Sequence, residues 1–444
     1  MNHESLVASL LEKIIKKNID QAEVYLSSTK TLKIDVHEQK VESIDEIRDQ
    51  GLGIRVIRDK KLGFAYTSDF DDYVLAETIS RAVENAKSSE ADGSNLLPGS
   101  QANEPLRLFD PKINDTPIEQ KIKLALSIEA SAYKADQRIK KTDKVTYSDS
   151  ESEISIANSH GLRGNYRTNS CGAFAEVIAV QNGEMESGMG MNYVKLFDNL
   201  KPEAIGQEAA NRALELLNAG LVPTQKLPLV FEPFVASQIL EVLATALSSD
   251  AVQKGKSLFA DKMDKAVGSS LLNIIDNGRL PGGLESSPFD GEGVATQETK
   301  LIENGVVRNF LFNFYTANKG GSKSTGNAVR ASFKSPPAVG PTNLYIATGS
   351  QEPGAIIKSL TKGLYITSLM GIHTANPISG DFSFGAAGLI IENGKKGYPV
   401  RGVTVAGNLI EMLKGLEAVG SDLRFIANIG SPTLLISGLT ISGG

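Results

Sequence analysis

The chain has 444 residues, of which 41% are hydrophobic and 22% are charged, and its formal net charge is −6. This length and composition predict a soluble globular protein of two or three domains. The acidic balance argues against direct binding to nucleic acid or to an anionic membrane, because clustered lysine and arginine are needed to hold phosphate groups.

The low cysteine content and the absence of long apolar runs favour a cytoplasmic location. Cys171 is the only cysteine, which excludes an intrachain disulfide and a zinc site built from several thiolates. No run of about 18 apolar residues occurs, so we expect no membrane span. The first residues carry Glu4 and Glu12 within an apolar pattern, which predicts an amphipathic helix rather than a signal peptide.

The first half of the chain predicts two α+β modules, at residues 1–95 and 104–222. Apolar residues at helical spacing predict helices over 5–17, 71–86, 117–138 and 202–218. Alternating patterns predict antiparallel strands around 32–37, from 51 to 57 and within 143–195. The segment 88–116 is rich in Ser, Gly, Pro, Asn and Asp and predicts a long irregular connection.

Residues 223–444 predict a β-rich C-terminal domain. A strand over 227–231 precedes a helix that begins at Pro233, since proline is tolerated in a first helical turn. Two Asn-Gly pairs, at 304–305 and 393–394, indicate tight hairpins. Further short strands, at 343–347 and 433–436, favour an antiparallel sheet or barrel, so the fold class expected for the chain is α+β.

Nucleophiles and metal ligands are sparse in this sequence. No two of the four histidines share a predicted helix, which excludes a helical zinc pair, and His373 alone lies in a Gly-rich stretch that could line a pocket. Cys171 has no neighbouring base, and Ser383 follows Asp381 where a serine elbow needs glycine. The Gly-rich segment 319–327 lacks the residue order of a phosphate-binding loop, but binding there is plausible because it is long and polar.

An ordered set of segments resembles the TldD/PmbA family, and specifically its PmbA (TldE) branch. These segments are GLGIRV (51–56), GFAYTSD (63–69), EGVATQETKLIENGVV (292–307), YTANKGGSKSTGNAVR (315–330), SGDFSFGAAGLIIENG (379–394), YPVRGVTVAGNL (398–409) and GSPTLLISGLTISGG (430–444). The resemblance implies a two-chain bacterial or archaeal protease that acts on unfolded or extended peptides in an enclosed cavity. Its TldD-like chain carries an HExxxH zinc helix and a cysteine ligand, and its PmbA-like chain lacks them. The family also bears the older label of modulator of DNA gyrase.

The stretch QILEVLATAL (238–247) covers the positions at which the resemblance implies the zinc motif. Leu240 and Thr245 stand at the two histidine positions and Glu241 at the glutamate, and the segment 419–435 has no cysteine. A catalytic zinc typically needs three protein ligands, and without it no bound water of lowered pKa is available for Glu241 to deprotonate. We therefore expect no cofactor in this chain, with zinc in a TldD-like partner. Glu241 is either a solvent-facing helix residue, which we favour, or a polar group in a cavity wall.

The leading hypothesis is a non-catalytic, PmbA/TldE-like subunit of a two-chain metallopeptidase. It would complete a chamber with a TldD-like paralogue and help to hold an extended peptide by strand addition. Its candidate cavity or peptide-binding residues are Ser324, Asn327, Arg330, His373, Asp381 and Ser383. Two alternatives are a stand-alone peptidase of this family, which could form a homodimer, and a gyrase-associated regulatory binding protein.

Overall fold

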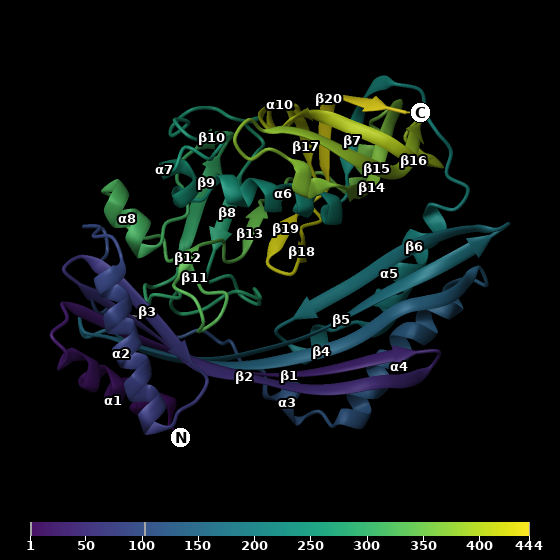
Figure 1. Ribbon diagram of the computed structural model, residues 1–444. Helices are drawn as coiled ribbons and strands as arrows, with labels where there is room; N and C mark the ends of the chain where they lie inside the picture. Colours follow the sequence, from purple (N-terminus) through teal and green to yellow (C-terminus); the bar gives the residue numbers. More distant parts are fainter. Residues whose placement is uncertain (1, 102–103, 444) are drawn as a thin grey trace.

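The first half of the protein forms one long antiparallel sheet. The computed structural model describes residues 2–101 and 104–443, and this sheet has the strand order β3-β2-β1-β4-β5-β6 (Figure 1). Its strands are β1 (Gln21–His37), β2 (Lys40–Arg58), β3 (Lys61–Thr67), β4 (Ile139–Asn158), β5 (Arg163–Gln181) and β6 (Glu184–Val194). Strands from both predicted modules therefore belong to one sheet, joined where β1 pairs with β4.

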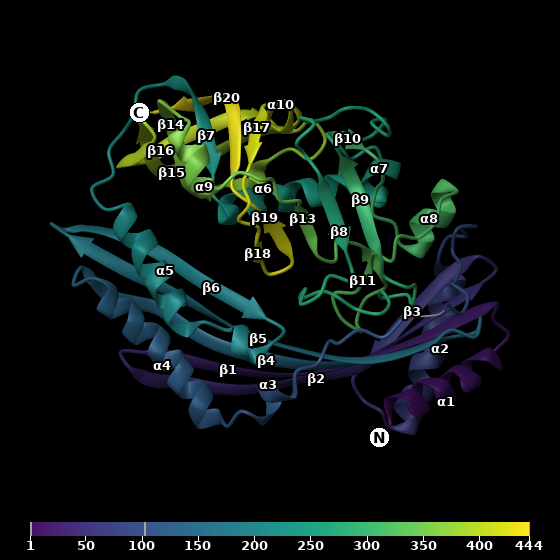
Figure 2. The ribbon, with the colours of Figure 1, turned by 180° about the vertical axis from the view of Figure 1, so that it is seen from behind.

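Helices cover the two ends of this sheet (Figures 1 and 2), and the last of them also contacts the C-terminal half through Arg212, which donates to Glu232. The helices are α1 (His3–Ile15), α2 (Asp72–Ser88), α3 (Pro111–Asp115), α4 (Ile118–Ala135) and α5 (Pro202–Glu215). The predicted helices are present with shifted ends, and α3 lies within the connection predicted to be irregular. Close packing requires glycine on β6, because a Cβ at Gly188 would lie 2.2 Å from the carbonyl oxygen of Ala209.

The C-terminal half contains a small closed barrel. Strands β16, β15, β14, β7 and β20 follow one another, and a pairing of β16 with β20 closes the ring, while β17 also pairs with β20. Their bounds are β7 (Gln225–Phe231), β14 (Lys362–Met370), β15 (Asp381–Glu392), β16 (Lys395–Asn408), β17 (Leu416–Val419) and β20 (Leu434–Ser442). The α+β class with a C-terminal barrel is thus confirmed.

A second sheet in this half has the order β10-β9-β8-β13-β19-β18. Its strands are β8 (Ile274–Asn277), β9 (Glu298–Glu303), β10 (Val306–Val307), β13 (Leu344–Ile346), β18 (Arg424–Ile426) and β19 (Ile429–Ser431), and β11 (Ala328–Val329) pairs separately with β12 (Ala338–Val339). Two pairings, β7 with β14 and β13 with β19, are parallel rather than antiparallel. Parallel neighbours need a long crossover, and a connection of that kind separates each of these pairs in the chain.

Helix α6 (Pro233–Ala246) lies between the barrel and the second sheet and contacts strands of both. Its buried side chains include Val235, Ile239, Leu240 and Leu243, which belong to the largest apolar cluster. The other helices of this half are α7 (Ser249–Gln253), α8 (Phe314–Gly320), α9 (Pro353–Lys358) and α10 (Leu409–Lys414). Within the described ranges, none of the helices combines the length and apolar character that a membrane crossing requires.

Candidate functional site

Helix α6 presents the three zinc-motif positions to different surroundings. Leu240 is 0% exposed within the apolar core, whereas Glu241 and Thr245 are exposed to solvent. No group of three or more His, Cys, Asp or Glu side chains is placed to hold a metal ion in the described residues. At the motif positions the helix offers only the carboxylate of Glu241 and the neutral hydroxyl of Thr245, a donor set that does not suit zinc.

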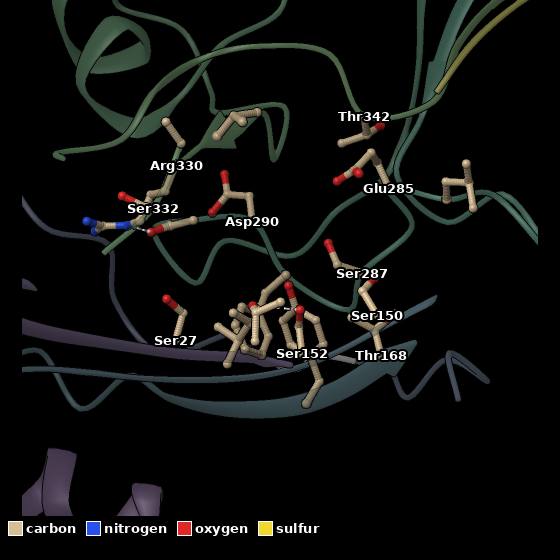
Figure 3. Close-up of a pocket in the computed structure, with 18 of the residues that line it drawn as sticks. Ser27, Ser150, Ser152, Thr168, Glu285, Ser287, Asp290, Arg330, Ser332 and Thr342 are labelled. Carbon is tan, nitrogen blue, oxygen red and sulfur yellow. Dashed lines mark hydrogen bonds between the residues drawn. The ribbon is translucent and has the colours of Figure 1, made fainter. Parts of the chain in front are cut away.

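A polar cavity of about 450 Å³ lies between the long sheet and the C-terminal half. Its floor is formed by hydroxyl side chains of β1, β4 and β5, namely Ser27, Thr29, Ser150, Ser152, Thr168 and Ser170. Its roof comes from the segments 284–291, 328–332 and 341–342. Figure 3 shows side chains of both groups facing the same space. We refer to this space as the hydroxyl-lined cavity.

The floor is polar because the central parts of β1 and β4 are polar. The runs Ser27–Thr31 (SSTKT) and Ser148–Ser152 (SDSES) lie on neighbouring strands, and Thr29 stands opposite Ser152. Opposite residues of an antiparallel pair point to the same face, and the hydroxyl oxygens of these two residues are 2.9 Å apart. Alternation along each strand then places every second hydroxyl in the cavity.

Buried charges join the two halves of the protein beside this cavity. Arg55 of β2 donates hydrogen bonds to Glu23 at 2.7 Å and to Glu292 at 2.8 Å. Arg330 pairs with the other oxygen of Glu23, and its guanidinium lies over the ring of Tyr25, with the Cζ atom 4.4 Å from the ring centroid. Burial opposes the charge of Arg55, but the two carboxylates outweigh it and raise the pKa of this guanidinium. The cluster is therefore a structural connection with little spare charge for a ligand.

Asp290 is the buried acid of the cavity roof. Its carboxylate accepts hydrogen bonds from the backbone N–H groups of Glu292 at 2.9 Å, Val294 at 3.0 Å and Ala328 at 2.9 Å. Burial, followed by repulsion from Glu292, raises the pKa of Asp290 to about 7, although the three N–H groups act in the opposite direction. These bonds hold the roof loop against β11, so the side chain has a clear structural role.

Lys195, directly after β6, is a buried cation in the cavity wall with no ion pair among the described residues. It is 8% exposed, and its ammonium donates a hydrogen bond to Thr168 Oγ1 at 2.6 Å. Burial lowers the pKa of Lys195 to about 8, and only the charge of Glu285 opposes this effect. An ammonium has three donors, so this group can bind a further acceptor.

Comparison with known families gives one consistent result along the chain. Family models described as PmbA/TldA metallopeptidase domain 1, central domain and C-terminal domain match residues 22–89, 111–217 and 224–443. The chain belongs to the PmbA/TldD metallopeptidase family.

Individual members of the PmbA/TldD family match over almost their whole length. The metalloprotease PmbA of Escherichia coli O157:H7 is 31% identical over 99% of this chain and 96% of its own. A Thermotoga maritima protein, provisionally named a modulator of a DNA gyrase, has a crystal structure that superimposes with a TM-score of 0.91 at 26% identity, covering 99% of this chain and 100% of that one. TldE from Thermococcus kodakarensis has the same fold, with a TM-score of 0.91 at 21% identity and coverage of 99% and 100%.

The six candidate binding residues do not gather in one place. Arg330 lines the hydroxyl-lined cavity but is engaged with Glu23. Asn327 is buried and donates to Asp276 at 2.7 Å, and the hydroxyl of Ser324 donates to the carbonyl of Phe312 at 3.2 Å. The other three, His373, Asp381 and Ser383, are exposed around the connection from β14 to β15 and do not line this cavity.

Sequence reasoning missed the hydroxyl rows and Lys195. The available signal was a run of Ser and Thr inside strands that otherwise alternate, in SSTKT and SDSES. The lysine carries no local signal, because its burial results from contacts with residues distant in sequence, such as Thr168. Cys171 is buried on β5, and burial raises the pKa of its thiol to about 12, which does not favour a thiolate nucleophile.

Proposed function

We propose that this chain is a PmbA/TldE-like subunit of a two-chain metallopeptidase, which leaves zinc chemistry to a TldD-like paralogue. The observation that carries the proposal is the geometry of α6, where Leu240 is in the core and Thr245 faces solvent. A leucine has no lone pair to give to a metal, and a neutral hydroxyl is a weak zinc ligand. Without zinc on this helix, Glu241, which is exposed, would have no metal-bound water to deprotonate.

The role that we propose for this subunit is to help hold an extended or unfolded peptide in the cytoplasm. The hydroxyl-lined cavity supports this role, because serine and threonine hydroxyls can both donate to and accept from peptide groups. Contacts of this kind go to the main chain and select little among peptide sequences. The volume of the hydroxyl-lined cavity, about 450 Å³, suits a few residues of a peptide rather than a folded domain.

The test is reconstitution with a TldD-like paralogue from the same genome. We expect the two chains to co-purify, the mixture to cleave an unstructured peptide, and this chain alone to be inactive. A chelator should abolish peptide cleavage by the mixture, and zinc bound to the paralogue should restore that cleavage. The variant Glu241→Ala in this chain should leave the activity of the mixture unchanged, whereas the matching glutamate of the paralogue should be essential.

Cleavage by this chain alone, abolished by a chelator, would contradict the proposal and favour the stand-alone peptidase. A gyrase-associated regulator stays a prediction of the sequence analysis, and a pull-down that captures gyrase and no paralogue would favour it. Size measurement of the isolated chain distinguishes a homodimer from a monomer that awaits its partner.

A further inference from the structure

A second cavity adjoins the first and differs from it in chemistry. It has a volume of about 330 Å³, and Lys195 lines both cavities. Its apolar walls are Leu106, Leu108, Phe109, Leu196, Leu280 and Pro281. Its charged lining residues are Arg107, Lys195 and Arg279, and among the described residues its walls include no Asp or Glu. We refer to this space as the cationic apolar cavity.

The three cations of this cavity have few partners of their own. Lys195 forms one hydrogen bond, to Thr168, and no ion pair in the part of the chain that the structure describes. Arg279 donates to the carbonyl of Glu104 at 3.1 Å and lies 3.8 Å from its carboxylate, which is 91% exposed. Arg107 is exposed and likewise makes no ion pair within the described ranges. A buried ammonium without an ion-pair partner is costly, and an anionic ligand here would offset that cost.

The walls restrict which anion fits. A ligand must combine one negative charge for Lys195 with an apolar group for the leucine and phenylalanine side chains. Because Lys195 lines both cavities, a ligand held at its ammonium lies next to the hydroxyl-lined cavity, whose serine and threonine side chains suit peptide groups. The C-terminal residue of a peptide meets all three conditions when its side chain is apolar. An internal stretch of peptide has no main-chain charge, and an acidic side chain offers little apolar surface.

We propose that the cationic apolar cavity binds the C-terminal residue of a peptide, with its carboxylate at Lys195 and its apolar side chain among the leucines. This inference rests on the proposed peptide-holding function and adds the end of the peptide that the subunit recognises. Glu285, in the wall of the neighbouring cavity, disfavours a carboxylate there and so favours its placement on the cationic side of Lys195.

The test measures binding of fluorescent ten-residue unstructured peptides to the full chain by anisotropy. One peptide ends in leucine with a free carboxylate, and its match ends in leucine amide. We expect the free acid to bind about ten-fold more tightly or better, because a charge-assisted hydrogen bond is lost in the amide. A peptide that ends in glutamate should also bind more weakly than the one that ends in leucine.

Variants assign the effect to the cavity. Lys195→Met should reduce the ratio of the two affinities, free acid over amide, to near one. Arg279→Gln, at a side chain that is 25% exposed, should reduce this ratio in part. The matched control is Lys256→Met at an exposed position, which should retain the preference. Urea unfolding verifies that each variant is folded, and the acid and amide comparison on the unmodified chain needs no variant.

Equal binding of acid and amide would overturn the inference and leave the proposed subunit role standing, since that role is tested by reconstitution with the paralogue. Failure of both peptides to bind would overturn it as well. Hexanoate, a small apolar acid without peptide groups, tests whether the site binds any apolar carboxylate. If it competes as strongly as the peptide, the site recognises a small acid and the assignment to a peptide end is wrong.

Discussion

Glu23 of β1 and Arg330, which follows β11, form an ion pair with side chains that are each 1% exposed, although 307 positions separate them in the chain. The same carboxylate also accepts from Arg55, which in turn contacts Glu292 of the C-terminal half. The long sheet and the C-terminal half are therefore joined by alternating buried charges. This connection holds the roof of the hydroxyl-lined cavity over its floor.

We expect Arg330→Met to lower the free energy of unfolding by about 3–5 kcal/mol, because removal of one member leaves a buried carboxylate under-compensated. Urea unfolding followed by circular dichroism measures this change. The control is Glu303→Gln in the surface pair with Lys300, which should leave the midpoint unchanged. A change at Arg330 no larger than at Glu303 would contradict the structural role of the cluster.

Restoring the two histidines of the motif should not create a zinc site. In the double variant Leu240→His, Thr245→His, the first imidazole enters an apolar core and the second faces solvent. We expect a loss of roughly 2–4 kcal/mol in the free energy of unfolding, from a buried polar ring and lost packing, without tight zinc binding. Thr245→His alone should be close to neutral. Metal content after dialysis checks the prediction, and stoichiometric zinc would contradict it.

The stability of the protein should depend on Lys195 in alkaline solution. Its pKa is lowered from 10.5 to about 8 in the folded state, so between these values the unfolded chain keeps a proton that the folded chain has released. The unfolded state then binds more protons, and the contribution of Lys195 to the free energy of unfolding rises with pH in this window. Lys195→Met lacks this contribution. Relative to the unmodified chain, the variant should therefore lose about 2 kcal/mol of stability between pH 7.5 and 9.5.

Urea unfolding at the two pH values measures the effect of Lys195. The exposed control Lys256→Met should follow the unmodified chain at both values, because its ammonium is in water in either state. Parallel profiles for all three proteins would show that Lys195 is not desolvated by the fold.

Local patterns in the sequence were sufficient for the elements and the class. Apolar spacing predicted α4 and α5, the Asn-Gly pairs predicted the turns before β10 and β16, and alternation placed Ile34 and Val36 on a buried face. These features depend on residues within a few positions of one another, so they can be read directly. The pairing of β1 with β4 could not be read, because its partners lie more than 100 residues apart in the chain and the polar runs where they meet specify no neighbour.

The sequence by itself determined that the stretch 238–247 has no histidine, so both histidines of the HExxxH motif are missing from it. The tertiary structure alone decided that Leu240 is in the core, that Ser27 and Ser150 share a floor, and that Lys195 is buried between two cavities. The physical reason is that the identity of a ligand is a property of one side chain. Burial and cavity shape, by contrast, arise from surfaces that come together only when distant segments pack.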